Sequence, residues 1–117
     1  MLTEKERQIG NEARALIDDE RRWMRDEFAR TRDGQRCQID DRKAYRFCAV
    51  GALAHAALRT CGGDVKQAYV VASEVECKLL GDEYRHLQDI NDGPGGHAAV
   101  LRIFDRALAS TLAMVTA

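Results

Sequence analysis

Apolar residues recur at steps of three and four along several stretches of the chain, which is the spacing of one face of an α-helix. The first stretch runs from Thr3 to Phe28 and predicts an amphipathic helix of about 25 residues. Thr3 and Glu6 have the spacing of a capping box at its start. The apolar positions of this stretch are Ile9, Ala13, Leu16, Ile17, Met24 and Phe28, with Trp23 beside them.

Residues 44–58 differ from the first stretch because apolar side chains lie almost all round the predicted helix. A helix without a polar face is normally buried, and its many alanines let neighbouring helices approach closely. Gly62 and Gly63 predict the end of this region, and Asp64 is a suitable N-cap for a helix that runs to Gly81. The polar residues 32–43 before it are expected to form a connecting loop.

The last third of the chain predicts a short helix or turn over residues 82–90, a polar loop over 91–96 and a final helix of about 18 residues. The apolar face of the final helix comprises Val100, Leu101, Phe104, Leu108, Thr111 and Leu112. Strand-like alternation is absent. The pattern therefore predicts an all-α fold, in which residues 1–117 form a single-domain bundle of four main helices plus one short helix around the Ala-rich central helix.

Composition and cysteine spacing place this chain among globular proteins of a reducing compartment. Its 117 residues are 45% hydrophobic and 32% charged, which suits one globular domain. No apolar run approaches the roughly 18 residues of a membrane span, and the charged N-terminus does not resemble a signal peptide. We therefore expect a cytoplasmic protein without a membrane partner. The cysteines lack paired spacing and are expected to be free thiols: Cys37, Cys48, Cys61 and Cys77.

The charge balance disfavours nucleic acid as a partner. Lysine and arginine number 18 against 19 aspartates and glutamates, so the net charge is −1. One local excess of arginine, from Arg21 to Arg32, is interspersed with carboxylates and is typical of a solvated helix face with ion pairs. The remaining candidate partners are a protein, a small ligand or a second copy of the chain.

One candidate for covalent chemistry is a cysteine–histidine pair made by Cys48 and His97. Cys48 lies early in the predicted central helix, where the helix dipole lowers a thiol pKa. His97 is a candidate base, and Asn91 or Asp92 a candidate group to orient it. The opposing interpretation is structural, because a cysteine among alanines is a packing residue and Asn91-Asp92-Gly93-Pro94 favours a turn. In that interpretation His97 caps the final helix.

His55 and Arg46 are candidate ligand-binding residues on the same predicted helix. His55 follows Cys48 by seven residues, so the two lie two turns apart on one stripe and can line one groove. Arg46, with Tyr45, can face an anionic ligand or simply extend its stem along apolar surface. The scattered cysteines and histidines lack the paired spacing of a zinc site, and neither a metal nor another cofactor is expected.

Several short segments together resemble a known group of proteins. Trp23 is followed by Phe47-Cys48-x-x-Gly51-Ala52-Leu53 and Asn91-Asp92, and then by Val100-Leu101 and Asp105-Arg106-Ala107. This order resembles a family of small bacterial and bacteriophage proteins of unknown function, over residues 17–108. The resemblance implies that Cys48, Gly51, Asn91 and Asp92 are positions of interest. It also implies that His97 occupies a position where threonine is common, which favours a cap over a general base.

We therefore expect a small α-helical accessory protein that binds a protein or a small ligand where the cysteine helix meets the Asn-Asp loop. The resemblance adds a role in phage biology or defence. The expected contact residues are Trp23, Arg46, Cys48, His55, Asn91 and Asp92. The alternative is a cysteine-dependent hydrolase or transferase that uses Cys48 with His97. A structural prediction also follows, in which Asn91 or Asp92 hydrogen-bonds backbone groups near the start of the cysteine helix.

Overall fold

The computed structural model describes residues 1–116, and the side chains of residues 1–109. The apolar positions predicted at Thr111 and Leu112 therefore lie outside the described side chains. The structure is mostly helical, with α1 (Glu4–Leu16), α2 (Ala49–Ala57), α3 (Val65–Leu80), α4 (Leu87–Asp92) and α5 (Gly96–Thr116). A small antiparallel sheet joins β1 (Ala29–Thr31) to β2 (Ala44–Phe47), and the 3₁₀ turns are η1 (Glu20–Arg22) and η2 (Leu58–Cys61).

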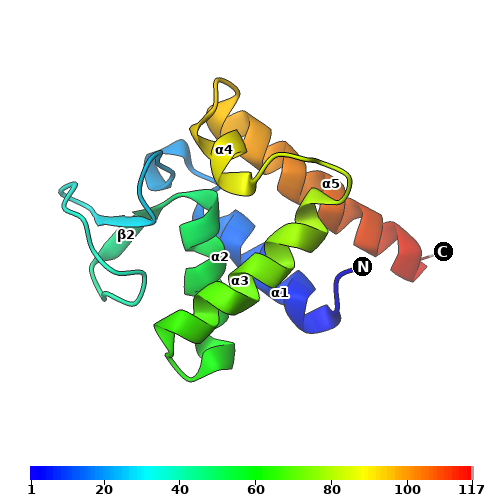
Figure 1. Cartoon of the computed structure of the whole chain (residues 1–117), viewed down its shortest axis with the longest axis horizontal. Helices are drawn as coiled ribbons and strands as arrows, with labels where there is room; N and C mark the ends of the chain where they lie inside the picture. The colour runs from blue at the N-terminus through cyan, green and yellow to red at the C-terminus, as the bar shows by residue number, and fades with distance from the viewer. Residues whose placement is uncertain (117) are drawn as a thin grey trace.

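Helix α2 lies at the centre of the helical body, as its composition predicts (Figure 1). It packs against α1, α3 and α4, and seven of its nine residues are buried. Small side chains make this close approach feasible, because at most a methyl group separates much of the α2 backbone from its neighbours. Leu53 of α2 and Phe104 of α5 are among the large, fully buried side chains of the core.

The predicted first helix is wrong beyond its first half. Helix α1 ends at Leu16, and Asp19 then caps η1 by accepting a hydrogen bond from the Arg21 amide. Asp26 adopts the left-handed conformation with φ 71°, which no continuous right-handed helix contains. Met24 and Phe28 thus match helical spacing only by chance. Met24 is buried, whereas Phe28, expected to face inward, is 47% exposed.

The second correction concerns residues 44–47, which form β2 rather than the start of the central helix. In the hairpin, Ala29 pairs with Phe47 and Arg30 with Arg46, and a bulge follows before Thr31 pairs with Ala44. The two strands have only three and four residues, which is at or below the shortest alternation that indicates a strand. The hairpin lies at one end of the molecule, and the start of α1 and the end of α5 lie toward the other (Figure 1).

Most other helix ends are where the local signals place them. The Thr3–Glu6 capping box is present, Asp64 accepts a hydrogen bond from the Gln67 amide, and α3 ends before Gly81. The short helix predicted over 82–90 is instead α4, so Asn91 and Asp92 belong to its last turn rather than to a loop. Among the helices of residues 1–116, none combines the length and apolar character needed to cross a bilayer.

Candidate functional site

Asn91 is fully buried and forms four hydrogen bonds at the junction of three segments. Its Oδ1 accepts from the Trp23 indole Nε1 at 2.7 Å and from the Ala49 backbone amide at 3.0 Å. Its Nδ2 donates to the Met24 carbonyl oxygen and to Asp92 Oδ1, each at 3.0 Å. Ala49 is the first residue of α2, so the predicted bond between the Asn-Asp pair and the start of the cysteine helix is confirmed.

Asp92 extends this network toward the surface. Its carboxylate accepts from the Asp26 backbone amide at 3.0 Å and from the Gln88 amide group at 3.0 and 3.1 Å. Partial burial alone raises the pKa of Asp92, but the hydrogen bonds from Asn91, Gln88 and Asp26 outweigh it and hold the pKa below its ordinary value. The charged carboxylate thus holds Asp26 in its left-handed turn.

Cys48 is the N-cap of α2 rather than a residue within its first turns. Its Sγ accepts from the Gly51 amide at 3.2 Å and donates to Gln88 Oε1 at 3.4 Å. Burial raises the pKa of the Cys48 thiol to about 11, although hydrogen bonds from the Gly51 and Val50 amides favour the thiolate. The thiol is therefore protonated at neutral pH, the reverse of what a cysteine nucleophile requires.

His97 lies in the first turn of α5 and bonds a different part of the molecule. Its Nε2 is 2.5 Å from the Ile17 carbonyl oxygen, so this nitrogen carries a proton and donates. The imidazole packs against Trp23 at 5.3 Å between ring centroids. Cys48 and His97 thus have separate hydrogen-bond partners, and the structure does not orient the His97 Nε2 toward the thiol.

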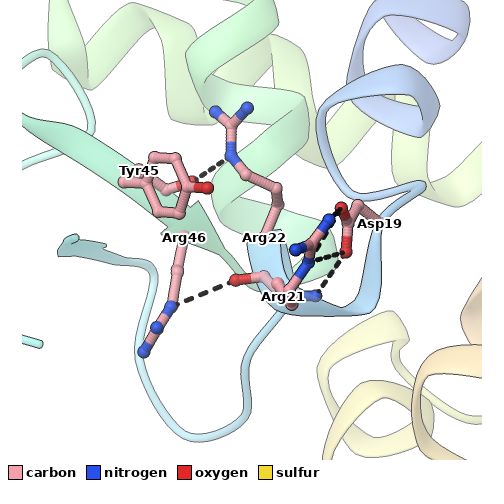
Figure 2. Close-up of polar contacts among 5 residues, drawn as sticks. All are labelled: Asp19, Arg21, Arg22, Tyr45 and Arg46. Atoms are coloured by element: carbon pink, nitrogen blue, oxygen red, sulfur yellow. Dashed lines mark hydrogen bonds and ion pairs between the residues drawn. The ribbon is translucent and has the colours of Figure 1, made fainter.

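Arg46 and Arg22 cross-link η1 to β2 through backbone carbonyls (Figure 2). Arg46 Nε donates to the Arg21 carbonyl at 3.1 Å, and Arg22 Nε donates to the Tyr45 carbonyl at 2.7 Å. The Arg22 guanidinium also lies 4.3 Å from the centroid of the Tyr45 ring. Arg21 instead pairs with Asp19, and its hydrogen bonds lower the pKa of Asp19 to about 2.

His55 is half-buried and fixed by the loop that precedes β2. Its Nδ1 lies 2.7 Å from the Ile39 carbonyl oxygen and donates to it, while the ring packs on Phe47 at 4.9 Å between centroids. In the neutral imidazole, Nε2 therefore has a lone pair available for a ligand. The prediction that Cys48 and His55 line one groove is wrong for Cys48, because Cys48 is fully buried, whereas His55 lines a surface groove between α1 and α2 together with Arg22.

Charge is distributed unevenly between two parts of the molecule. Residues 20–47, here called the arginine-rich segment, contain nine arginines or lysines and six carboxylates, a net charge of +3. The remaining residues contain nine arginines or lysines and thirteen carboxylates, a net charge of −4. The predicted ion pairs exist for Arg21 and Arg30, but not on one helix face. Arg22, Arg32 and Arg46 are not paired with a carboxylate of the described side chains.

A family model for proteins of unknown function, DUF6197, matches residues 1–110. The chain belongs to this family. Neither a curated protein nor a solved structure matches the chain. The DUF6197 match confirms the resemblance to a family of unknown function and spans both the arginine-rich segment and the helical body. Because DUF6197 carries no assigned activity, the function of this member has to be argued from its own geometry.

Sequence reasoning gave Arg22, Arg32 and Lys43 no common location, because it placed them in a predicted helix and a predicted loop. The density of arginine between residues 21 and 46 was the available signal. Of the predicted site residues, the structure brings Trp23, Asn91 and Asp92 into one network, joined to Cys48 through Gln88. Arg46 and His55 lie outside that network. Among the described side chains, no three His, Cys, Asp or Glu residues are grouped to hold a metal ion.

Proposed function

We propose that this DUF6197 member is a non-catalytic binding protein whose arginine-rich segment docks an acidic segment of a partner protein. The observation that carries the proposal is a cavity at the hairpin with an excess of cations. It is lined by Thr31, Arg32, Asp33, Arg42, Lys43 and Tyr45. We call it the Tyr45 cavity.

The electrostatics of the Tyr45 cavity favour a carboxylate from outside the chain. Arg32, Arg42 and Lys43 are exposed and form no salt bridge among the described side chains, although Lys43 lies near enough to Asp33 to favour its charged form. Asp33 is the acidic residue in the lining, but the Thr31 hydroxyl donates to it and holds its pKa below the ordinary value. The Arg32 guanidinium lies 5.3 Å from the Tyr45 ring centroid, so a cation–π contact restrains it. Three cations around one occupied carboxylate suit a partner that supplies acidic side chains.

A protein partner fits the charge pattern better than nucleic acid does. A phosphate backbone carries dense, uniform negative charge, and it meets six carboxylates within the arginine-rich segment and a net −4 on the rest of the chain. Acidic side chains of a peptide can be spaced to avoid those carboxylates. The unpaired state of all four cysteines supports a cytoplasmic setting for this partner.

The buried network gives the other predicted residues a supporting role in this proposal. Cys48 and Asn91 are fully buried, so they act from below the surface. Asn91 fixes Trp23 and the Met24 carbonyl, which precede the hairpin, while Asp92 fixes the Asp26 turn. The network thereby sets the position from which the hairpin presents its cations.

The test measures binding of a fluorescent glutamate-rich peptide by anisotropy at low salt. Arg32→Gln/Lys43→Gln is expected to weaken binding about tenfold or more, because the contacts of one guanidinium and one ammonium group are lost. The control, Lys5→Gln/Lys66→Gln, removes the same charge from exposed positions of α1 and α3 and is expected to bind like the wild type. Equal losses in both variants would show a non-specific charge effect and overturn the proposal.

Two further measurements separate the other occupants. Tighter binding of oligouridine than of the peptide, lost in the hairpin variant, would identify nucleic acid as the partner and refute a protein one. Light scattering tests a second copy, whose acidic helical body is also a source of carboxylates. A dimer abolished by Arg32→Gln/Lys43→Gln would make this chain its own partner and support the docking surface.

A further inference from the structure

A second surface feature, distinct from the Tyr45 cavity, is the groove between the last turns of α1 and the end of α2. Its floor is apolar and is formed by Ala15, Leu16, Ala56 and Leu58. Such a floor, with a few polar groups at its edge, is the usual composition of a small-molecule site. We call it the His55 groove.

Arg22 supplies the positive charge of the His55 groove. Its Nε is occupied by the Tyr45 carbonyl and one face of its guanidinium by the Tyr45 ring, so the group is held from two sides. Figure 2 shows the two terminal nitrogens at the far end of the side chain, turned away from Asp19 and Arg21. These nitrogens form the two-pronged donor set that binds a carboxylate or phosphate group.

Among the residues that line the groove, Arg22 is the charged group without a salt bridge, although Asp19 outside the groove lies near enough to interact with its charge. Arg59 pairs with Glu12 at the rim, so these two side chains neutralise each other. His55 donates through Nδ1 to the Ile39 carbonyl, which leaves Nε2 as an acceptor in the neutral ring. The groove thus combines one fixed cation, one hydrogen-bond acceptor and an apolar floor.

From this arrangement we propose that the His55 groove binds a small organic anion. The anionic group, carboxylate or phosphate, binds the terminal nitrogens of Arg22, and the apolar body lies on Ala15, Leu16, Ala56 and Leu58. A hydroxyl or N–H of the ligand donates to His55 Nε2. The charged group of this site differs from those of the Tyr45 cavity, because Arg22 is absent from the lining of that cavity, although Tyr45 borders the cavity and also holds Arg22.

The test uses four phenyl probes and calorimetry on the wild-type chain. 4-Hydroxyphenylacetate and 4-hydroxyphenyl phosphate are expected to bind with dissociation constants of about 1 mM or tighter, and the tighter of the two identifies the preferred anion. Phenylacetate, which lacks the donor for His55, is expected to bind several-fold more weakly. Tyramine carries a cation in place of the anion and is expected not to bind. Equal binding of tyramine, or no binding of either anion at about 10 mM, would refute the site.

Matched variants assign the binding to the groove. Arg22→Gln is expected to weaken anion binding at least about tenfold, since it removes the charge and its paired donors. Arg46→Gln is the control, because Arg46 makes the same kind of Nε bond across the same η1–β2 junction. Ala15 is exposed, so Ala15→Phe is expected to obstruct the floor and abolish binding without disturbing the core. Unchanged affinity in Arg22→Gln, or equal losses in Arg22→Gln and Arg46→Gln, would contradict the proposal.

Discussion

The helical body and the arginine-rich segment are held in place by different forces. In the body, α1 and α3 pack on α2, and α5 packs on α1 and α3, through buried side chains such as Ile9, Leu53, Val75 and Phe104. The arginine-rich segment contributes few buried residues, among them Ala29, Ile39 and Phe47. Much of its attachment is polar instead and comes from Asn91, Asp92 and reciprocal arginine–carbonyl bonds.

This difference indicates how each region responds to substitution. Apolar burial is shared among many side chains, so a single truncation removes a fraction of it. A polar anchor is concentrated in one residue, and its removal leaves several buried groups without partners. We therefore expect single substitutions at the anchors to loosen the arginine-rich segment while the helical body persists.

The largest effect is expected for Asn91→Ala. The substitution removes the partners of Trp23 Nε1, the Ala49 amide and the Met24 carbonyl, and the expected loss is about 4 kcal/mol in the free energy of unfolding. Urea denaturation measures it. Asn11→Ala, at an exposed position of α1, is the matched control and is expected to change stability by less than about 0.5 kcal/mol. Similar values for the two variants would remove the distinction between the regions.

Gly51→Ala tests the contact between α2 and the segment. A Cβ at Gly51 would overlap the Phe28 carbonyl oxygen, so the chain just before β1 has to move, at a cost of about 3 kcal/mol. In Gly10→Ala the new Cβ meets only the flexible end of Leu108 at 3.3 Å, and a change within about 1 kcal/mol is expected. Hydrogen exchange should increase in residues 24–47 of Gly51→Ala before it does in α3. Uniform loosening of both regions would contradict the comparison.

The smallest effect is expected for Asp92→Asn, and it depends on pH. Hydrogen bonds hold the folded pKa of Asp92 below its ordinary value, so the carboxylate stabilises the fold at neutral pH and this contribution disappears as pH falls through the folded pKa. At pH 7 the variant should be less stable by about 0.5–1 kcal/mol, given the partial exposure of the carboxylate. Thermal unfolding between pH 7 and 2 should show this difference shrinking. A difference constant over the whole range would exclude the charge of Asp92 as its cause.

Local signals predicted the helical body well, and the reasons are specific. Thr3 with Glu6, Asp64, and Gly62 each act on backbone groups within a few residues, so their consequences can be deduced from neighbours in sequence. The helix predicted beyond Leu16 was wrong, because Met24 and Phe28 continued the helical spacing by chance. The pairing of β1 with β2 is set by residues some 15 apart and leaves no local pattern.

The candidate site could be predicted only in part. Glycine, asparagine and aspartate in two short segments indicated a junction, and Asn91 does bond the start of α2. The sequence does not reveal that the Trp23 indole also bonds Asn91 at this junction, because the two residues are 68 positions apart. Nor does it reveal that Arg22 and Arg46 exchange bonds between η1 and β2, since that requires the hairpin.

The Asn91 network also affects the order of events during folding. Its bonds to Trp23 and Ala49 join residues 68 and 42 positions apart, so large loops must close before either bond forms. Local turns and helices form in microseconds or less, whereas contacts between distant residues wait for the search over chain conformations. Trp23 is the chain's single tryptophan, and its indole reaches Asn91 only when that search has ended. We therefore expect its fluorescence to report when the arginine-rich segment closes onto α4 during folding.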